Sequence, residues 1–136
     1  MERTRTLSEF LRNGRLGGLS FGSSKADVRG LLGPARGPLA LVWDYGALEV
    51  AFDGEAVRTI TLRFDADVRL PRAVALAGWL PTRRTTFREF QRWLAGERIP
   101  YRMAIPSDRS LALQAGRAAV RFALDGTRTS LERIQA

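Results

Sequence analysis

The side-chain chemistry of this chain depends mainly on arginine, because the sequence contains no histidine and no cysteine. Those absences exclude a histidine general base, a cysteine nucleophile, a thiolate metal site and a disulfide framework. The only lysine, Lys25, lies in a polar stretch that indicates a turn and leaves little room for a buried catalytic amine. Asp65 and Asp67 could share a cation, but two carboxylates alone make a weak site. We therefore predict a protein that is not an enzyme and holds no metal and no cofactor.

The basic residues are unevenly distributed along the chain of 136 residues, whose net charge is +8. Residues 1–70 carry ten basic and nine acidic side chains, a balance of +1, whereas residues 71–136 carry twelve and five, a balance of +7. A general preference for arginine would raise both halves alike, so we expect the second half to present a basic surface. Guanidinium groups there could bind the carboxylates of a protein or the phosphates of a nucleic acid.

Nine aromatic and arginine residues are candidates for binding a partner, because Trp, Tyr and Arg most often make interface hot spots. Trp43 and Tyr45 precede a tight turn, and Trp79 lies in a long connecting segment. The alternatives are that the aromatic side chains pack in the core and that the arginines form an ordinary solvated face. The candidates are Trp43, Tyr45, Trp79, Arg83, Arg84, Arg88, Arg92, Arg117 and Arg121.

Three segments that begin at Thr6, Ser24 and Thr86 match the pattern [ST]-x-x-[DE], which predicts the start of a helix. In this pattern the hydroxyl caps a backbone amide and the carboxylate reaches back to the first residue. After Ser24 and after Thr86 the apolar residues recur at the same helical spacing. Gly33-Pro34 and Gly96 predict where these two helices end.

Each of these two helices is followed by alternating apolar residues, as expected of strands with one buried face. Asp53-Gly54 and Asp125-Gly126 interrupt the alternation and predict hairpin turns. On the helix around Arg88 and on the strand around Arg121, the arginines should point away from the core. The predicted strands cover residues 39–45, 46–52, 57–64, 110–114, 116–122 and 129–134.

The order of these elements predicts a tandem α-β-β-β repeat, with an extra helix at about residues 6–13. The units are residues 18–65 and 84–136, within a single domain of residues 1–136. One unit is too small to bury its sheet face alone, so we expect an α+β, two-layer fold with one antiparallel sheet and helices on one face. Residues 65–84 form the connector and should cross the surface.

The motifs Phe21-Gly22-Ser23-Ser24, Leu32-Gly33-Pro34 and Tyr45-Gly46-x-Leu48-x-Val50-x-Phe52 lie within residues 20–62. This part of the chain resembles the helix-and-hairpin unit of BamE/SmpA-like domains, here duplicated. The resemblance does not extend to a signal peptide or a lipid-acceptor cysteine, so the membrane-assembly function of that family is not expected. The whole chain is similar to small, poorly characterised cytoplasmic bacterial proteins of the immunity-protein kind, and this resemblance implies binding to a protein.

The leading hypothesis is a non-enzymatic protein-binding module, an immunity- or antitoxin-like inhibitor of a partner with an acidic surface patch. The aromatic candidates would anchor the partner and the second-half arginines would match its charge. The alternative is nucleic-acid binding through the basic second half, with an affinity that falls steeply with salt. No signal or membrane span is recognised, so a cytoplasmic location is expected. The open sheet edges are compatible with a monomer or a homodimer.

Overall fold

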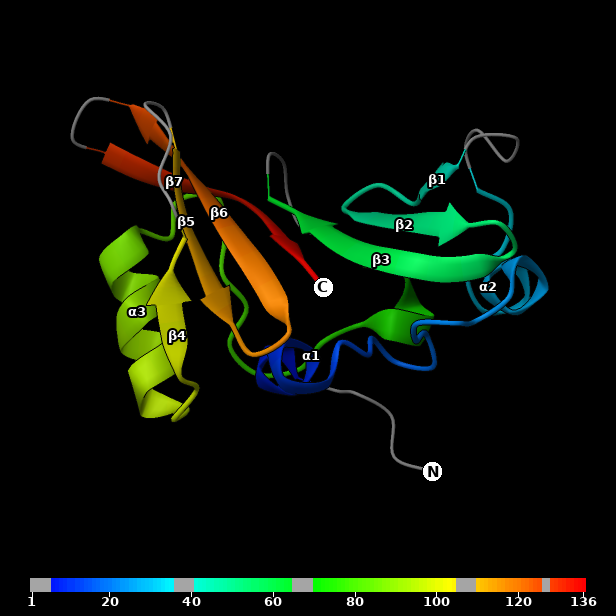
Figure 1. Cartoon of the computed structure of the whole chain (residues 1–136), viewed down its shortest axis with the longest axis horizontal. Helices are drawn as coiled ribbons and strands as arrows, with labels where there is room; N and C mark the ends of the chain where they lie inside the picture. Colours follow the sequence, from blue (N-terminus) through cyan, green and yellow to red (C-terminus); the bar gives the residue numbers. More distant parts are fainter. Residues whose placement is uncertain (1–5, 36–40, 65–69, 105–109, 126–127) are drawn as a thin grey trace.

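In the residues that this computed structural model describes, 6–35, 41–64, 70–104, 110–125 and 128–136, seven strands form one open antiparallel sheet (Figure 1). Helices cover one face of the sheet, which confirms the predicted α+β, two-layer class. The elements are α1 (Leu7–Asn13), α2 (Lys25–Leu32), β1 (Val42–Asp44), β2 (Leu48–Asp53), β3 (Ala56–Arg63), the 3-10 turn η1 (Arg72–Val74), α3 (Phe87–Gly96), β4 (Tyr101–Met103), β5 (Ser110–Ala115), β6 (Ala118–Asp125) and β7 (Arg128–Gln135).

The predicted capping boxes are confirmed at the starts of α2 and α3. At α2 the amide of Asp27 donates to the Ser24 hydroxyl at 3.0 Å, and the Ser24 amide donates to the Asp27 carboxylate at 3.1 Å. At α1 only half of the pattern forms, since the Glu9 carboxylate accepts from the Thr6 hydroxyl and not from its backbone. Two orphan amides are thus satisfied at α2 and α3 and one at α1.

Helix α3 ends at Gly96, as predicted, but Gly96 is itself the last helical residue and does not adopt the left-handed conformation of a cap. The left-handed residue that ends the helix is Arg98, with φ 57°. The amide of Ile99 donates to the Leu94 carbonyl at 2.9 Å, and the Arg98 amide donates to the Ala95 carbonyl at 3.1 Å. This is the Schellman arrangement, with an arginine in the position that usually holds glycine.

The strand order is β1-β2-β3-β7-β6-β5-β4, so the last strands of the two halves meet in the middle of the sheet. The first half has α2 followed by three strands, and the second half has α3 followed by four. The additional strand is β4, an edge strand whose three side chains are all exposed. It was not predicted because three exposed residues show no alternation. The α-β-β-β repeat itself stays a prediction.

A short ladder between β3 and β7 joins the two halves of the sheet. Its register is Thr61↔Gln135, Leu62↔Ile134 and Arg63↔Arg133. Ile60 and Ala136 extend the ladder through two reciprocal backbone hydrogen bonds of 3.1 and 2.9 Å. By contrast, β6 pairs with β7 from residue 128 to residue 135. Among the described residues, the first residues of β7 are therefore paired with a strand on one side only.

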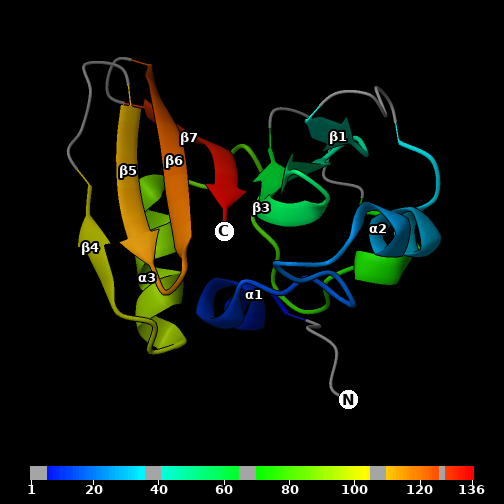
Figure 2. The same ribbon diagram turned by 45° about the vertical axis from the view of Figure 1, so that its right-hand side comes forward.

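The core lies between the sheet and the helices. Of the sheet residues predicted to face the helices, only Leu124 is half-buried. The others are buried, namely Leu48, Val50, Phe52, Ile60, Leu62, Phe64, Val120, Phe122, Leu131 and Ile134. Helix α1 lies between α2 and α3 beneath the middle of the sheet (Figures 1 and 2) and contributes the buried side chains of Phe10 and Leu11.

The connector between the two halves is more than a surface crossing, because the Val74 side chain of η1 is fully buried. Ala77, further along, forms an isolated parallel bridge with Thr6 next to α1. The start of the connector at residues 65–69, with Asp65 and Asp67, lies outside the described residues. Across the described part of the chain, no helix is long and apolar enough to cross a membrane.

The hairpin between β5 and β6 holds α1 in place. Its Arg117 amide donates to the Leu11 carbonyl at 2.7 Å. Gly116, with φ 57°, lies so close to α1 that a Cβ atom there would collide with the Leu11 carbonyl group. Glycine is therefore required at this position both for its backbone conformation and for the space.

We expect Gly116→Ala to lower the free energy of unfolding by about 2 kcal/mol more than Gly54→Ala does. Gly54 is the matched control, since its φ is 63° and a Cβ there would have no atom within 4 Å. Both variants carry the left-handed strain, about 1–2 kcal/mol, but only Gly116→Ala displaces α1. Urea unfolding measures both values, and equal losses would contradict the role assigned to this contact.

Candidate functional site

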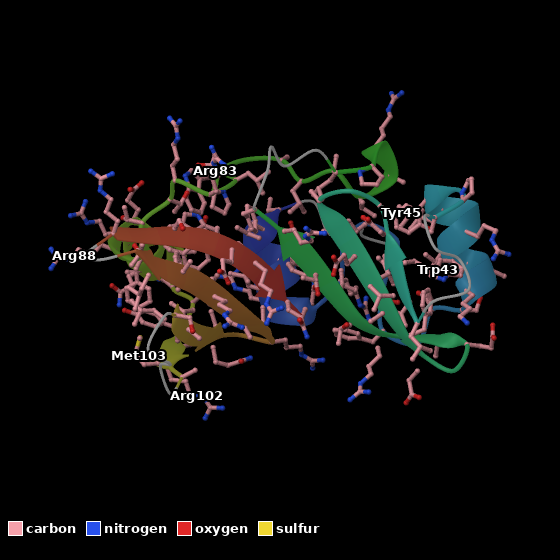
Figure 3. The ribbon with its side chains drawn as sticks, turned by 90° about the horizontal axis from the view of Figure 1, so that it is seen from above. Trp43, Tyr45, Arg83, Arg88, Arg102 and Met103 are labelled. Carbon is pink, nitrogen blue, oxygen red and sulfur yellow. The ribbon has the colours of Figure 1, made fainter. Side chains whose placement is uncertain are left out.

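The nine candidate residues do not form one surface. Figure 3 shows Trp43 and Tyr45 near one end of the molecule and Arg83 and Arg88 near the other. A partner contact that combines all the aromatic anchors with the second-half arginines is therefore not supported by their placement. The aromatic candidates and the arginine candidates are therefore considered separately.

Trp43 is a core residue, with 1% of its surface exposed. Its ring packs against Phe52 at a centroid distance of 4.6 Å, and the guanidinium of Arg29 lies over it at 5.3 Å. Trp43 is the buried residue of the three in β1. Its burial removes it from the candidate surface anchors.

Tyr45 also has a structural role at this end. Its hydroxyl donates to the Gly33 carbonyl at 3.0 Å, which ties the turn after β1 to the end of α2. Burial raises the pKa of the Tyr45 phenol above its usual value, and the positive charge of Arg29 opposes that rise. The neutral phenol is thus the form that this site favours.

Trp79 is the one aromatic candidate that remains accessible, with 42% of its surface exposed. Its ring lies 4.8 Å from that of Trp93 and 6.2 Å from that of Phe90, both on α3. Trp79 therefore belongs to the same helix layer as Arg88 and Arg92 and extends it with an exposed aromatic surface.

Three of the arginine candidates line one cleft of about 960 Å³ between the start of α3 and the first residues of β7. Its described lining is Arg83, Arg84, Thr86, Phe87, Arg88, Leu111, Arg128, Thr129 and Ser130. Arg92 is exposed further along α3, Arg117 lies in the turn before β6, and Arg121 points from the open face of the sheet. The prediction that Arg117 projects from that face is wrong, because it lies in the turn.

A tight turn of threonine residues positions the arginines that precede α3. The Thr82 amide donates to the Thr85 hydroxyl at 2.9 Å, and the Arg84 amide donates to the Thr82 hydroxyl at 3.2 Å. Thr85 is buried, so Arg83 and Arg84 point into solvent beside the cleft. The Phe87 amide donates to the Thr129 hydroxyl at 3.0 Å, which fixes α3 against β7.

The cleft has a cationic rim and an apolar floor. None of Arg83, Arg84, Arg88 and Arg128 forms an ion pair with a described carboxylate, and no described acidic side chain lines the cleft. Half-buried Phe87 and Leu111 supply apolar surface, and the Phe87 ring packs edge-on against Phe122 at 5.3 Å. A low-dielectric floor beneath several cations strengthens their attraction for an anion.

A second group of arginines lies on the open face of the sheet. Arg63, Arg133 and Arg121 occupy neighbouring positions on β3, β7 and β6, and we call them the arginine row. Arg63 pairs with Glu49 at 2.9 Å and Arg121 with Glu132 at 3.4 Å, whereas Arg133 has no ion pair with a described residue. Directly opposed like charges destabilise a sheet.

Sequence reasoning missed Arg128 and Arg133. Arg133 alternates with Ile134 on a predicted strand, so its outward direction could have been inferred from the period of two. Arg128 was assigned to the turn because the predicted strand began at Thr129. No sequence pattern indicated that Arg128 would line the same cleft as Arg83 and Arg84, since that arrangement depends on tertiary packing.

Comparison of the chain with protein-family models, with curated proteins and with solved structures finds no match. Among the described residues, no group of three or more Asp or Glu side chains could hold a metal ion. The chemistry of the cleft therefore has to carry the functional assignment.

The raised pKa of Tyr45 predicts a loss of stability in alkaline solution. Above about pH 10 the unfolded chain releases this proton more readily than the folded chain, so the free energy of unfolding falls as pH rises through the folded-state pKa. Tyr45→Phe should lower the free energy of unfolding by about 1 kcal/mol at neutral pH, because the hydrogen bond to Gly33 is lost. Above pH 10, the free energy of unfolding of this variant should fall less than that of the unmodified chain. Urea unfolding across this pH range tests both points; parallel pH profiles would contradict the assignment.

The arginine row predicts that Arg133→Gln stabilises the chain at low ionic strength, by roughly 0.5–1 kcal/mol, through relief of repulsion from Arg63 and Arg121. The gain should shrink in about 1 M salt, where charges are screened within about 3 Å. Arg58→Gln is the control, since Arg58 is exposed on β3 and has no residue directly opposite. A lower melting temperature for Arg133→Gln than for the unmodified chain in low salt would refute this account.

Proposed function

We propose that this chain is a non-enzymatic protein-binding module whose cleft takes an acidic segment of its partner. The observation that carries the proposal is the set of four arginines around one cleft, Arg83, Arg84, Arg88 and Arg128, without an ion pair to any described carboxylate. Cations without an ion pair to a described carboxylate are available for a partner's anions.

The dimensions of the cleft favour a peptide segment over a single small anion. Its volume of about 960 Å³ is at the upper end of the range of ligand pockets, roughly 300–1,000 Å³. Arginine binds carboxylates through two parallel hydrogen bonds, and the apolar surface of Phe87 and Leu111 can contact a side chain between them. The described lining contains hydroxyls and guanidinium groups but no carboxylate base, which suits binding more than acid–base catalysis.

An inhibitor of the immunity or antitoxin kind is the biological role that we propose for this binding. Such a protein acts by covering a functional surface of its partner, and complementary charge speeds the encounter and fixes the orientation. Exposed Trp79, packed on α3 through Trp93, is the aromatic residue best placed to extend such a contact beyond the cleft.

Nucleic-acid binding is the second candidate, and the arginine row is the observation that favours it. Three guanidinium groups across adjacent strands could follow a phosphate backbone. Two of them, Arg63 and Arg121, are already paired with carboxylates. Ala112 and Ala119 point to the same face and offer no ring on which bases could stack. The cleft therefore supports protein binding more strongly.

We expect the cleft variant, in which Arg83, Arg84, Arg88 and Arg128 are all replaced by Gln, to bind a glutamate-rich peptide at least about tenfold more weakly than the unmodified chain. The control replaces Arg15, Arg58, Arg72 and Arg102, four exposed arginines outside the cleft, and lowers the net charge by the same amount. Fluorescence anisotropy with the labelled peptide measures both affinities. Losing one bidentate contact costs about 1.5–3 kcal/mol, so retained binding by the control distinguishes a site from general attraction.

The same variants separate the two candidate functions when a labelled single-stranded oligonucleotide replaces the peptide. Equal weakening of peptide binding in the cleft variant and the control would refute the cleft as a site. Oligonucleotide binding that exceeds peptide binding, and that falls steeply with salt, would favour the second candidate. Capture of a protein from cell lysate, with and without nuclease, then identifies the partner.

A further inference from the structure

One side of the cleft is a strand edge that pairs with no described strand. Residues 128–130 of β7 pair with β6, and the ladder with β3 begins only at Arg133. At Leu131 the edge is closed by the chain that precedes α3, because the Leu131 amide donates to the Arg83 carbonyl at 3.1 Å. Before that residue, no described strand lies on the outer side of β7.

The backbone of Thr129 faces this free edge. Amide and carbonyl groups of alternate residues in a strand point to the same side. Since the Leu131 amide points away from β6 to Arg83, the Thr129 amide and carbonyl two residues earlier also point away from β6. The Thr129 side chain is engaged separately, as its hydroxyl accepts from the Phe87 amide.

We propose that the acidic segment binds as an added β-strand, which pairs with the amide and carbonyl of Thr129 and places its carboxylates among the arginines of the cleft. This inference rests on the proposed function and specifies how the partner is recognised. Backbone pairing supplies affinity and alternate side chains supply specificity, as in other cases of strand addition. The partner segment is extended, rich in Asp or Glu, and has free amide groups at alternate residues.

The positive charge around the cleft favours the edge of β7 over the other strand edges, and it favours an acidic strand as the segment that binds there. The two outer edges of the sheet, β1 and β4, also pair with no described strand, but the four cleft arginines surround the cleft beside β7. A second copy of the chain is a poor occupant, since two such edges side by side would bring their arginines together. An acidic strand from another protein meets both requirements, because it pairs with the backbone and neutralises the rim.

Proline at position 129 tests the backbone contact. Thr129→Pro removes the amide that points away from β6 and leaves the ladder to β6 intact, because proline is tolerated where the amide points away from the neighbouring strand. Thr129→Val is the matched control, which loses the hydroxyl but keeps the amide. With a labelled peptide of alternating glutamate and valine, we expect Thr129→Pro to bind at least about tenfold more weakly than Thr129→Val. Equal affinities would overturn the proposal.

A second measurement uses the unmodified chain, so it does not depend on whether Thr129→Pro folds. The same peptide is methylated either at the glutamate amides or at the valine amides. Strand addition predicts that one set of methyl groups weakens binding at least about tenfold and the other set has little effect, because alternate amides face β7. Equal effects of the two sets would overturn strand addition.

These outcomes are distinguishable from failure of the proposed function. If neither proline nor methylation matters while the cleft variant still loses the peptide, the cleft binds acidic segments without backbone pairing, and only the inference fails. If the cleft variant binds the peptide as well as the unmodified chain does, both the function and the inference fail. Protection of the Thr129 amide from hydrogen exchange in the presence of the peptide would locate the added strand directly.

Discussion

The short ladder between β3 and β7 is the constraint on which the rest of this structure depends. It places Leu62 opposite Ile134, both fully buried, so Arg63 and Arg133 must face outward and lie opposite each other. A slip of one residue would move the apolar side chains to the solvent face. The core therefore fixes the register, and the repulsion within the arginine row is a consequence that the core outweighs. Because the ladder is so short, it also leaves the first residues of β7 without a second neighbouring strand in the part of the chain that the structure describes.

Burial beneath the ladder joins the two halves together with the ladder hydrogen bonds. A backbone hydrogen bond contributes about 0.5–1.5 kcal/mol net, whereas burial of one large apolar side chain contributes about 1.5–3 kcal/mol. Phe10 and Leu11 of α1 are both fully buried under this region. Helix α1 also accepts the Arg117 amide from one hairpin, and its Arg12 side chain donates to the Glu97 carbonyl beyond α3 at 2.6 Å. Helix α1, which lies outside the two predicted units, thus stabilises the junction between them.

The sequence predicted those parts of the fold that depend on neighbouring residues. Capping boxes, the Asp53-Gly54 turn and the inward alternation of β2 and β6 are local patterns, and the structure confirms them. The burial of the Trp43 side chain could not be predicted, because the apolar run Leu41-Val42-Trp43 has no alternation to show which residue faces inward. The cleft itself was not predicted; Arg83, Arg84 and Arg88 were candidates, but the lining arginines come from a loop, a helix and a distant strand.

The difference between the two arginine groups follows from their surroundings and decides which one recognises a ligand. At about 4 Å, a pair of unit charges interacts by about 1 kcal/mol in bulk water and by about 4 kcal/mol at the effective dielectric near a protein surface. The arginine row lies on an open face, and carboxylates already engage two of its three members. The cleft arginines surround a hollow with an apolar floor and have no ion pair with a described carboxylate. The row therefore contributes mainly to long-range attraction, which salt screens, whereas the cleft can discriminate among the anions that reach it.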